Sequence, residues 1–306
     1  MTTVASVADN TLKKLLTGPA LPALPQSAVR VLELLKDPDC DPAVFAVPLE
    51  SDPGLVSQVL RFVNSSYFGF AREISSVRTA ISLVGVQTIE NFVLWSAIFS
   101  SIPDPKSGSF HFRLAWYDSL KRAVFARSMA RLLRSVDAED AFCAALLQDV
   151  AVPLLVKAEP EAYHEILEQR RETGRRLSDL ERERFGWTHG DAARVVCHQW
   201  NLPELLAEMI ARHLETERLD QPGVEPDAMT AVILSALLPS TIDAEWNEQP
   251  LFEQSYARLA PPMAPSPQDF LQDVERQLKD LLPLAGFAAG SPPGDRRTRG
   301  GAGGVA

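Results

Sequence analysis

The stretch Ala144-Ala145-Leu146-Leu147-Gln148-Asp149-Val150-Ala151-Val152 decides the fold of this chain. Alanine and leucine have high helix propensities, so the stretch predicts a helix, which we expect to run over residues 137–156. Its only polar side chains are an amide and a carboxylate, which stand next to each other at Gln148 and Asp149. A proline inside a helix removes a hydrogen bond and clashes with the preceding turn. We therefore expect the helix to bend or break near Pro153.

Helical periodicity also dominates the rest of the chain, and the alternation typical of strands is nearly absent. Asp41-Pro42 and Asp52-Pro53 each combine an N-cap aspartate with a proline at the first helical position. Ser76 is suited to cap a further short helix. In the second half, the spacing of Ser178 and Glu181 fits a capping box. These patterns predict an all-α protein.

Proline, glycine and serine are concentrated in residues 103–109, which we interpret as a linker between two helical lobes. The predicted parts are a lead-in (1–20), an N-terminal lobe (21–105), a second lobe (106–215), a C-terminal helical extension (216–283) and a disordered tail (284–306). The tail is mostly Gly, Pro and Arg and offers little to bury.

The 306 residues are 46% hydrophobic, which is enough for a sizeable core, and carry a formal net charge of −10. An acidic surface argues against nucleic acid as a partner. The cysteines, Cys40, Cys143 and Cys197, are far apart and lack metal-type spacing, which is typical of a reducing compartment. We expect Cys143 to be a buried structural thiol. No signal peptide or membrane-spanning run is evident, so the chain is predicted to be cytoplasmic, without a membrane partner.

The order of these motifs resembles the HDOD family, the HD-related output domains of bacterial signalling proteins. The resemblance extends from about Leu21 to Leu214 and rests on the order and spacing of many short segments. In the first lobe they lie at residues 21–25 (Leu-Pro-Ala-Leu-Pro), 52–55, 60–69, 74–77 and 80–85. In the second lobe they lie at residues 116–119, 145–149, 185–189 (Phe-Gly-Trp-Thr-His), 200–203 and 210–213.

The resemblance implies an all-α, two-lobed helical bundle whose second lobe has an HD-superfamily-like helical core. HD phosphohydrolases bind a divalent cation through an adjacent His-Asp pair. Here the first member of that pair is Gln148, and an amide carbonyl is a poor ligand for a transition metal. Asp118 stands where another histidine ligand would be, whereas His189 and His213 match positions that carry histidines in fuller relatives.

Two interpretations of these positions stay open. In the first, they form a vestigial pocket without catalytic residues, metal or cofactor: Trp116, Asp118, Gln148, Asp149, His189 and His213. In the alternative, Asp118, Asp149, His189 and His213 converge on a cation and support a weak metal-dependent phosphohydrolase, acting on a nucleotide or cyclic dinucleotide. We favour the first, because the loss of the pair histidine removes a strong ligand that nothing adjacent replaces.

Four arginines form the one strong basic cluster, interleaved with acidic residues: Arg170, Arg171, Arg175 and Arg176. They are either a salt-bridged solvent face or a docking patch for an acidic partner or an anionic nucleotide. The predicted function is a non-catalytic signal-transduction module of HDOD type. We expect it to bind a signalling protein partner, with a nucleotide or cyclic dinucleotide as candidate small ligands.

Overall fold

The computed structural model describes residues 11–16, 21–34, 41–65, 67–106, 108–221, 223 and 225–282. Every regular element in these residues is helical, as the sequence predicts. The predicted tail (284–306), most of the predicted lead-in and Cys40 lie outside the described residues.

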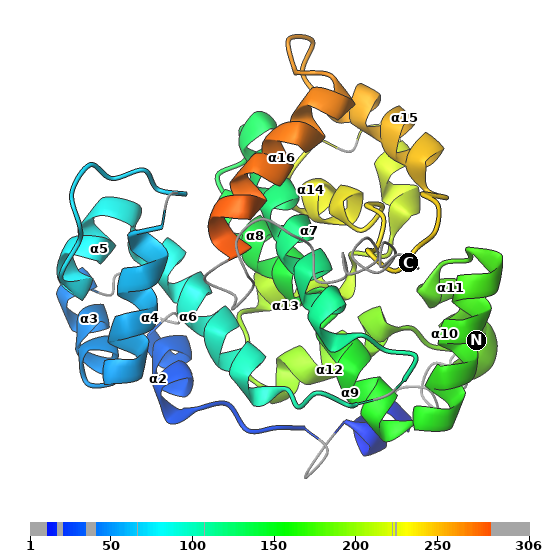
Figure 1. Cartoon of the computed structure of the whole chain (residues 1–306), viewed down its shortest axis with the longest axis horizontal. Coiled ribbons are helices and arrows are strands. Elements are labelled where there is room, and N and C mark those ends of the chain that lie inside the picture. The colour runs from blue at the N-terminus through cyan, green and yellow to red at the C-terminus, as the bar shows by residue number, and fades with distance from the viewer. Residues whose placement is uncertain are drawn as a thin grey trace, which may run out of the picture.

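Helices α2 to α6 form one end of the molecule, and α6 extends from this group toward the remainder (Figure 1). They are α2 (Gln26–Leu34), α3 (Pro42–Glu50), α4 (Pro53–Val63), α5 (Val77–Val84) and α6 (Val86–Ser101). The predicted N-caps are confirmed. The Asp41 carboxylate accepts a hydrogen bond from the Ala43 N–H at 2.8 Å, and the Asp52 carboxylate accepts one from the Gly54 N–H at 2.9 Å. These bonds satisfy N–H groups that have no partner within the helix.

The other end of the molecule is built around α7 (Phe112–Leu132), which packs against α8, α14 and α16. The remaining helices follow in chain order: α8 (Ala138–Leu147), α9 (Ala151–Ala158), α10 (Pro160–Thr173), α11 (Leu177–Phe185), α12 (His189–Gln199), α13 (Glu204–Ala211), the 3₁₀ helix η2 (Thr216–Asp220), α14 (Ala228–Ser235), α15 (Gln249–Leu259) and α16 (Pro267–Leu281). Helix α15 was not among the predicted elements.

The helix predicted over residues 137–156 is interrupted at Gln148–Val150, which is earlier than expected. Pro153 lies inside α9, near its N-terminal end, where proline is tolerated. A proline ring clashes with the carbonyl of the residue four positions earlier, which here is Asp149. The turn tightens instead, with the Val152 N–H donating to the Asp149 carbonyl at 3.0 Å. The proline therefore displaces the break toward the pair of polar residues.

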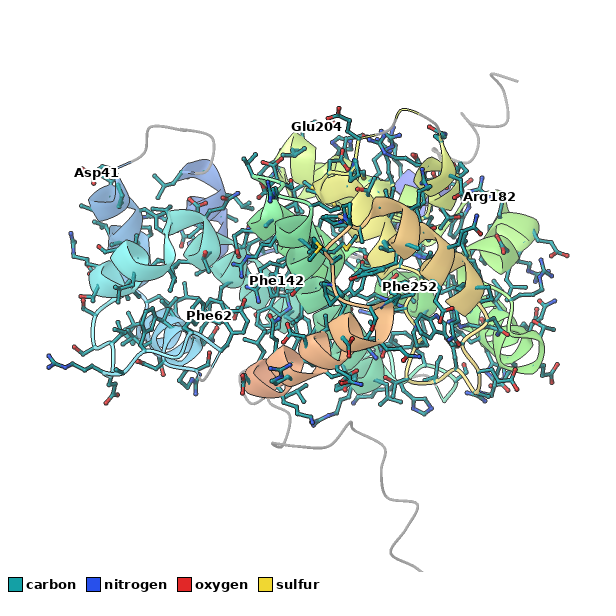
Figure 2. The ribbon with its side chains drawn as sticks, turned by 90° about the horizontal axis from the view of Figure 1, so that it is seen from above. Asp41, Phe62, Phe142, Arg182, Glu204 and Phe252 are labelled. Atoms are coloured by element: carbon teal, nitrogen blue, oxygen red, sulfur yellow. The ribbon has the colours of Figure 1, made fainter. Side chains whose placement is uncertain are left out.

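One apolar core continues across the predicted boundary between the lobes. Figure 2 shows Phe62 in the N-terminal group of helices and Phe142 and Phe252 in the remainder, and all three belong to this core. By length and composition, residues 138–158 could span a membrane, but 83% of their most apolar window is buried inside the protein. Helices α5 and α6 meet the same criterion only as a pair bent by 116°. Burial of this kind is typical of the core helix of a soluble protein.

Candidate functional site

A cavity of about 130 Å³ lies beside α7, at the break between α8 and α9. The structure brings all six residues of the predicted pocket to its wall: Trp116, Asp118, Gln148, Asp149, His189 and His213. They come from α7, from the α8–α9 turn, from the first residue of α12 and from the segment after α13. The six residues therefore lie around one cavity.

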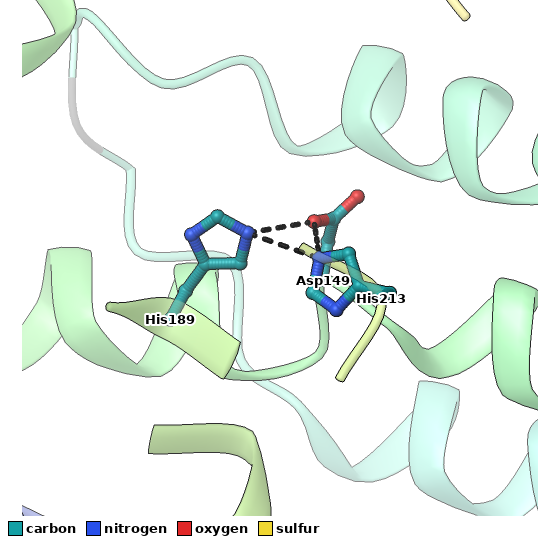
Figure 3. A group of neighbouring side chains, drawn as sticks. All are labelled: Asp149, His189 and His213. Carbon is teal, nitrogen blue, oxygen red and sulfur yellow. Dashed lines mark hydrogen bonds and ion pairs between the residues drawn. The ribbon is translucent and has the colours of Figure 1, made fainter. Parts of the chain in front are cut away.

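Only three of the six side chains converge on a common point (Figure 3). The Nε2 atom of His189 lies 3.4 Å from Oδ1 of Asp149 and 3.2 Å from Nε2 of His213. The Nε2 atom of His213 lies 3.7 Å from the same carboxylate oxygen. Two ring nitrogens and one carboxylate oxygen therefore form a compact triangle, in which both histidines are buried.

Glu181 fixes the orientation of His189 from the side away from this triangle. Its Oε2 accepts hydrogen bonds from the His189 backbone N–H at 2.7 Å and from Nδ1 at 2.6 Å. Its Oε1 accepts one from the Tyr163 hydroxyl at 2.8 Å, and the side chain is fully buried. The predicted capping box of Ser178 and Glu181 is wrong, because α11 begins at Leu177 without a side-chain cap and Glu181 points into the core instead.

The two histidines hold protons with very different strength. Burial lowers the pKa of His189, but the carboxylates of Glu181 and Asp149 outweigh this effect and raise it to about 9. Burial and the neighbouring positive charge of His189 lower the pKa of His213 to about 3. The Nδ1 of His213 lies 2.7 Å from the Ile210 carbonyl, to which its proton is donated. At neutral pH, His189 is therefore an imidazolium, and His213 is neutral with its Nε2 lone pair toward His189.

Arg122 of α7 completes the site, and it was not predicted. Its guanidinium pairs with Oδ2 of Asp149, the oxygen that the histidines leave free, and 14% of its side chain is exposed. Although burial raises the pKa of the Asp149 carboxyl, Arg122 and His189 hold it well below its usual range. The one sequence signal for Arg122 is its position four residues after Asp118, which places both on one face of α7.

Gln148 and Asp118 form hydrogen bonds to other parts of the chain. The Oε1 atom of Gln148 accepts a hydrogen bond from the Ser235 hydroxyl of α14 at 3.2 Å. The Asp118 carboxylate accepts hydrogen bonds from the Ser240 hydroxyl at 2.5 Å and the Thr241 N–H at 3.0 Å, and from the Thr241 hydroxyl. The alternative prediction of a four-residue cation set is therefore wrong in Asp118, which lies outside the triangle.

The three donor atoms of the triangle fit a single metal ion by their spacing. Ligands about 2.1 Å from a tetrahedral ion lie about 3.4 Å apart, close to the separations of 3.2, 3.4 and 3.7 Å found here. Glu181 and the Ile210 carbonyl resemble the outer partners that orient histidine ligands in metal sites. No further group of three such ligands is found among the described residues.

The four arginines of the predicted docking patch do not form one surface. Arg170 and Arg176 line the cavity, and Arg170 pairs with Asp243. Arg171 and Arg175 are exposed and pair with Glu168 and Glu183. The alternative of a salt-bridged solvent face therefore fits Arg171 and Arg175 but not the two arginines that line the cavity. Cys143 is fully buried, as expected, and burial raises the pKa of its thiol.

The described residues thus form an all-α protein with a His/Asp cluster at the break between α8 and α9. The family model for the HDOD domain matches residues 21–216, and the chain belongs to this family. The resemblance read from the sequence motifs is thereby confirmed.

Known structures with the same fold come from several bacteria. An HDOD domain protein with unknown function from Geobacter sulfurreducens has a TM-score of 0.66 at 17% identity, over 90% of this chain and 97% of the other. A proposed phosphohydrolase from Shewanella amazonensis has a TM-score of 0.61 at 18% identity, over 92% and 90% of the two chains. A proposed signal transduction protein from Marinobacter aquaeolei has a TM-score of 0.66 at 19% identity, over 92% and 64%. At these identities the likeness shows the fold alone.

A curated relative, an uncharacterized protein from Treponema pallidum, is 22% identical over 199 residues. The match covers 63% of this chain but only 37% of the relative. The chain therefore spans little more than a third of the length of that relative.

Proposed function

We propose that this chain is a non-catalytic regulatory module of HDOD type, which acts by binding a signalling protein partner or a small ligand. The observation that carries the proposal is the internal cation at the site, the guanidinium of Arg122 on Asp149. The arginine provides, within the chain itself, positive charge of the kind that a bound cation would otherwise provide to this carboxylate.

The charges of the cluster balance without an ion. Arg122 and the protonated His189 carry two positive charges, and Asp149 and Glu181 carry two negative charges. A metal ion would have to displace the proton of His189, because only neutral imidazole binds metal. With a pKa of about 9, that competition weakens apparent metal affinity at pH 7 by roughly 100-fold, before repulsion by Arg122 is counted.

A second candidate, a weak metal-dependent phosphohydrolase, is favoured by one observation, the spacing of the three donor atoms. Asp149, His189 and His213 would hold the ion, and Glu181 would orient His189. When bound, such an ion polarises a phosphoryl group and activates water. The Gln148 amide, bonded to Ser235, contributes no ligand to this set.

Hydrolysis of a chromogenic phosphodiester with added Mn²⁺ at pH 7 distinguishes the two. The regulatory proposal expects the rate of the wild-type chain to equal that of Asp149→Ala and of the buffer with Mn²⁺. The matched control is Glu183→Gln, an exposed carboxylate away from the cavity. Turnover by wild type and Glu183→Gln that Asp149→Ala abolishes, with all three chains folded by circular dichroism, would establish the hydrolase instead.

A further inference from the structure

The segment between α14 and α15 covers part of the cavity. We refer to residues 238–248 as the strap. It follows the last residue of the HDOD match, residue 216, by more than twenty positions, so it is an addition to the part of the chain that the family defines. Its side chains of Leu238, Ser240, Ile242 and Glu248 line the cavity together with Arg122, Arg170 and Arg176.

Two kinds of contact fasten the strap. Near its start, the Asp118 carboxylate accepts hydrogen bonds from Ser240 and Thr241, as described above. Further along, Asp243 forms a two-pronged pair with Arg170, whose Nη2 lies 2.9 Å from Oδ1 and 2.8 Å from Oδ2. Both of these side chains are only 18% exposed. The first contact joins neutral donors to a carboxylate, whereas the second joins opposite charges.

At the end of the strap, a second pair of opposite charges joins the strap to the cavity. Glu248 lies 3.7 Å from the Nε of Arg176, and both side chains are about one-fifth exposed. The Asn247 amide donates to the Gly174 carbonyl at 3.1 Å, beside the turn that leads to Arg176. The strap therefore presents two carboxylates to the two cavity arginines that α10 and the start of α11 supply.

While the strap is in place, the arginines of the cavity are paired with carboxylates. Each of the three cavity arginines has a carboxylate partner: Asp149 for Arg122, Asp243 for Arg170 and Glu248 for Arg176. Two of those partners belong to the strap. If they withdraw, two guanidinium groups face a cavity of about 130 Å³, which has room for a small anion. Paired guanidinium groups favour phosphate through bidentate, charge-assisted hydrogen bonds.

We propose that the strap is a gate over a phosphate site, and that a ligand carrying a phosphate or pyrophosphate group binds Arg170 and Arg176 in place of Asp243 and Glu248. This deepens the ligand-binding part of the proposed function and rests on it. Binding releases the strap, and because α15 begins at Gln249, directly after Glu248, the release reaches α15. Occupancy of the cavity is thereby coupled to the outer face of the C-terminal helices.

Titration calorimetry with inorganic pyrophosphate at low ionic strength tests the gate. Asp243→Asn removes the competing charge and keeps the shape of the side chain, so we expect it to bind pyrophosphate about 10-fold more tightly than wild type. Arg170→Met should weaken binding at least 10-fold in the Asp243→Asn background. Glu183→Gln removes an equal charge from an exposed pair with Arg175 and is the matched control, expected to leave the affinity unchanged.

Hydrogen exchange supplies a second measurement that does not depend on catalysis. Pyrophosphate should increase amide exchange in residues 238–248 of the wild-type chain. Equal tightening by Glu183→Gln and Asp243→Asn would show a general charge effect and overturn the gate. So would the absence of pyrophosphate binding by Asp243→Asn at millimolar concentration, or faster exchange confined to other segments. None of these results depends on whether the chain hydrolyses phosphodiesters, so the two proposals fail separately.

Discussion

Two arginines of α7, five residues apart, lie in contrasting surroundings. Arg122 faces the cavity and pairs with Asp149, which also contacts both histidines. Arg127 faces the joint with the N-terminal helices, where its guanidinium lies between the rings of Tyr67 and Phe142, at 4.3 and 4.4 Å from their centroids. Its nearest carboxylate oxygen, on Glu139, is 3.7 Å away.

The guanidinium of Arg122 balances the charge of Asp149, whereas that of Arg127 mainly fills space between two aromatic rings. Among the described residues, Nε and Nη2 of Arg127 have no hydrogen-bond partner, and its side chain is only 1% exposed. Burial lowers the pKa of Arg127, whereas the carboxylates around Arg122 outweigh the same effect and raise its pKa. The cavity therefore depends on ion pairing, and the joint depends on cation–π contact and packing.

The largest effect is expected from Arg122→Met. The substitution keeps an unbranched chain of similar length but leaves Asp149, which is 22% exposed, without its main counter-charge. Removing one partner of a largely buried pair costs about 3 kcal/mol in the free energy of unfolding. Urea denaturation at pH 7 measures it, and a loss below about 1 kcal/mol would show that Arg122 is not the balancing charge.

The next effect is a pH dependence that arises in the cavity. The pKa of His189 is about 9 in the folded chain, above its ordinary value of 6.5, so the folded state holds a proton that the unfolded state releases. Its contribution to stability is complete below about pH 6.5 and is lost as the pH rises through 9. The free energy of unfolding should fall by up to about 1.4 kcal/mol per pH unit across this window.

His189→Gln should flatten that slope, whatever its effect on stability at pH 7. His198, which is exposed on the same helix, provides the control substitution His198→Gln, for which the slope should remain. A slope that is the same in wild type and His189→Gln would place the proton elsewhere.

A smaller effect is expected on the joint side of α7. Arg127→Met replaces the guanidinium with an apolar chain that still fills the space between the two rings. Glu139 keeps its contact with Arg131, at 2.7 Å, so no buried carboxylate is left without a partner. We expect a loss of about 1 kcal/mol, the size of a cation–π contact, and at most half the loss caused by Arg122→Met. Equal losses in parallel denaturation experiments would remove the distinction between the two arginines.

The smallest effect concerns Glu90 of α6, which is 7% exposed beside α8. Burial and the nearby charge of Asp140 raise its pKa to about 7. The folded chain therefore holds a proton that the unfolded chain releases between about pH 4.5 and 7, so this group's contribution to stability falls over that range. Glu90→Gln should stabilise the chain by at least about 1 kcal/mol at pH 8 and have little effect at pH 5, as thermal denaturation would show. A gain that is equal at both pH values would contradict this assignment.

Local signals predicted much of the fold, because helix caps depend on neighbours in sequence. Asp41 and Asp52 cap their helices as expected, and the order of motifs identified the family. The sequence predicted the residues around the cavity but not the hydrogen bonds and ion pairs that connect them. Glu181 has the spacing of a capping residue, yet it serves His189 eight residues later, and only tertiary packing decides between these partners.

The strap and Arg122 were missed for a related reason. Ser240, Thr241 and Asp243 meet residues more than seventy positions away, and no spacing in the sequence reports such contacts. Gln148 illustrates the opposite case. Its place beside Asp149 was visible in the sequence, but its bond to Ser235 of α14 required the structure.

In the proposed function, Arg122 and the protonated His189 balance the charge of the site without a bound ion. Elemental analysis of protein purified without added metal or chelator tests this most directly. We predict well under one-tenth of an equivalent of any transition metal per chain, both in the wild-type protein and in Asp149→Ala. One equivalent in the wild-type chain that is absent from Asp149→Ala would contradict the claim.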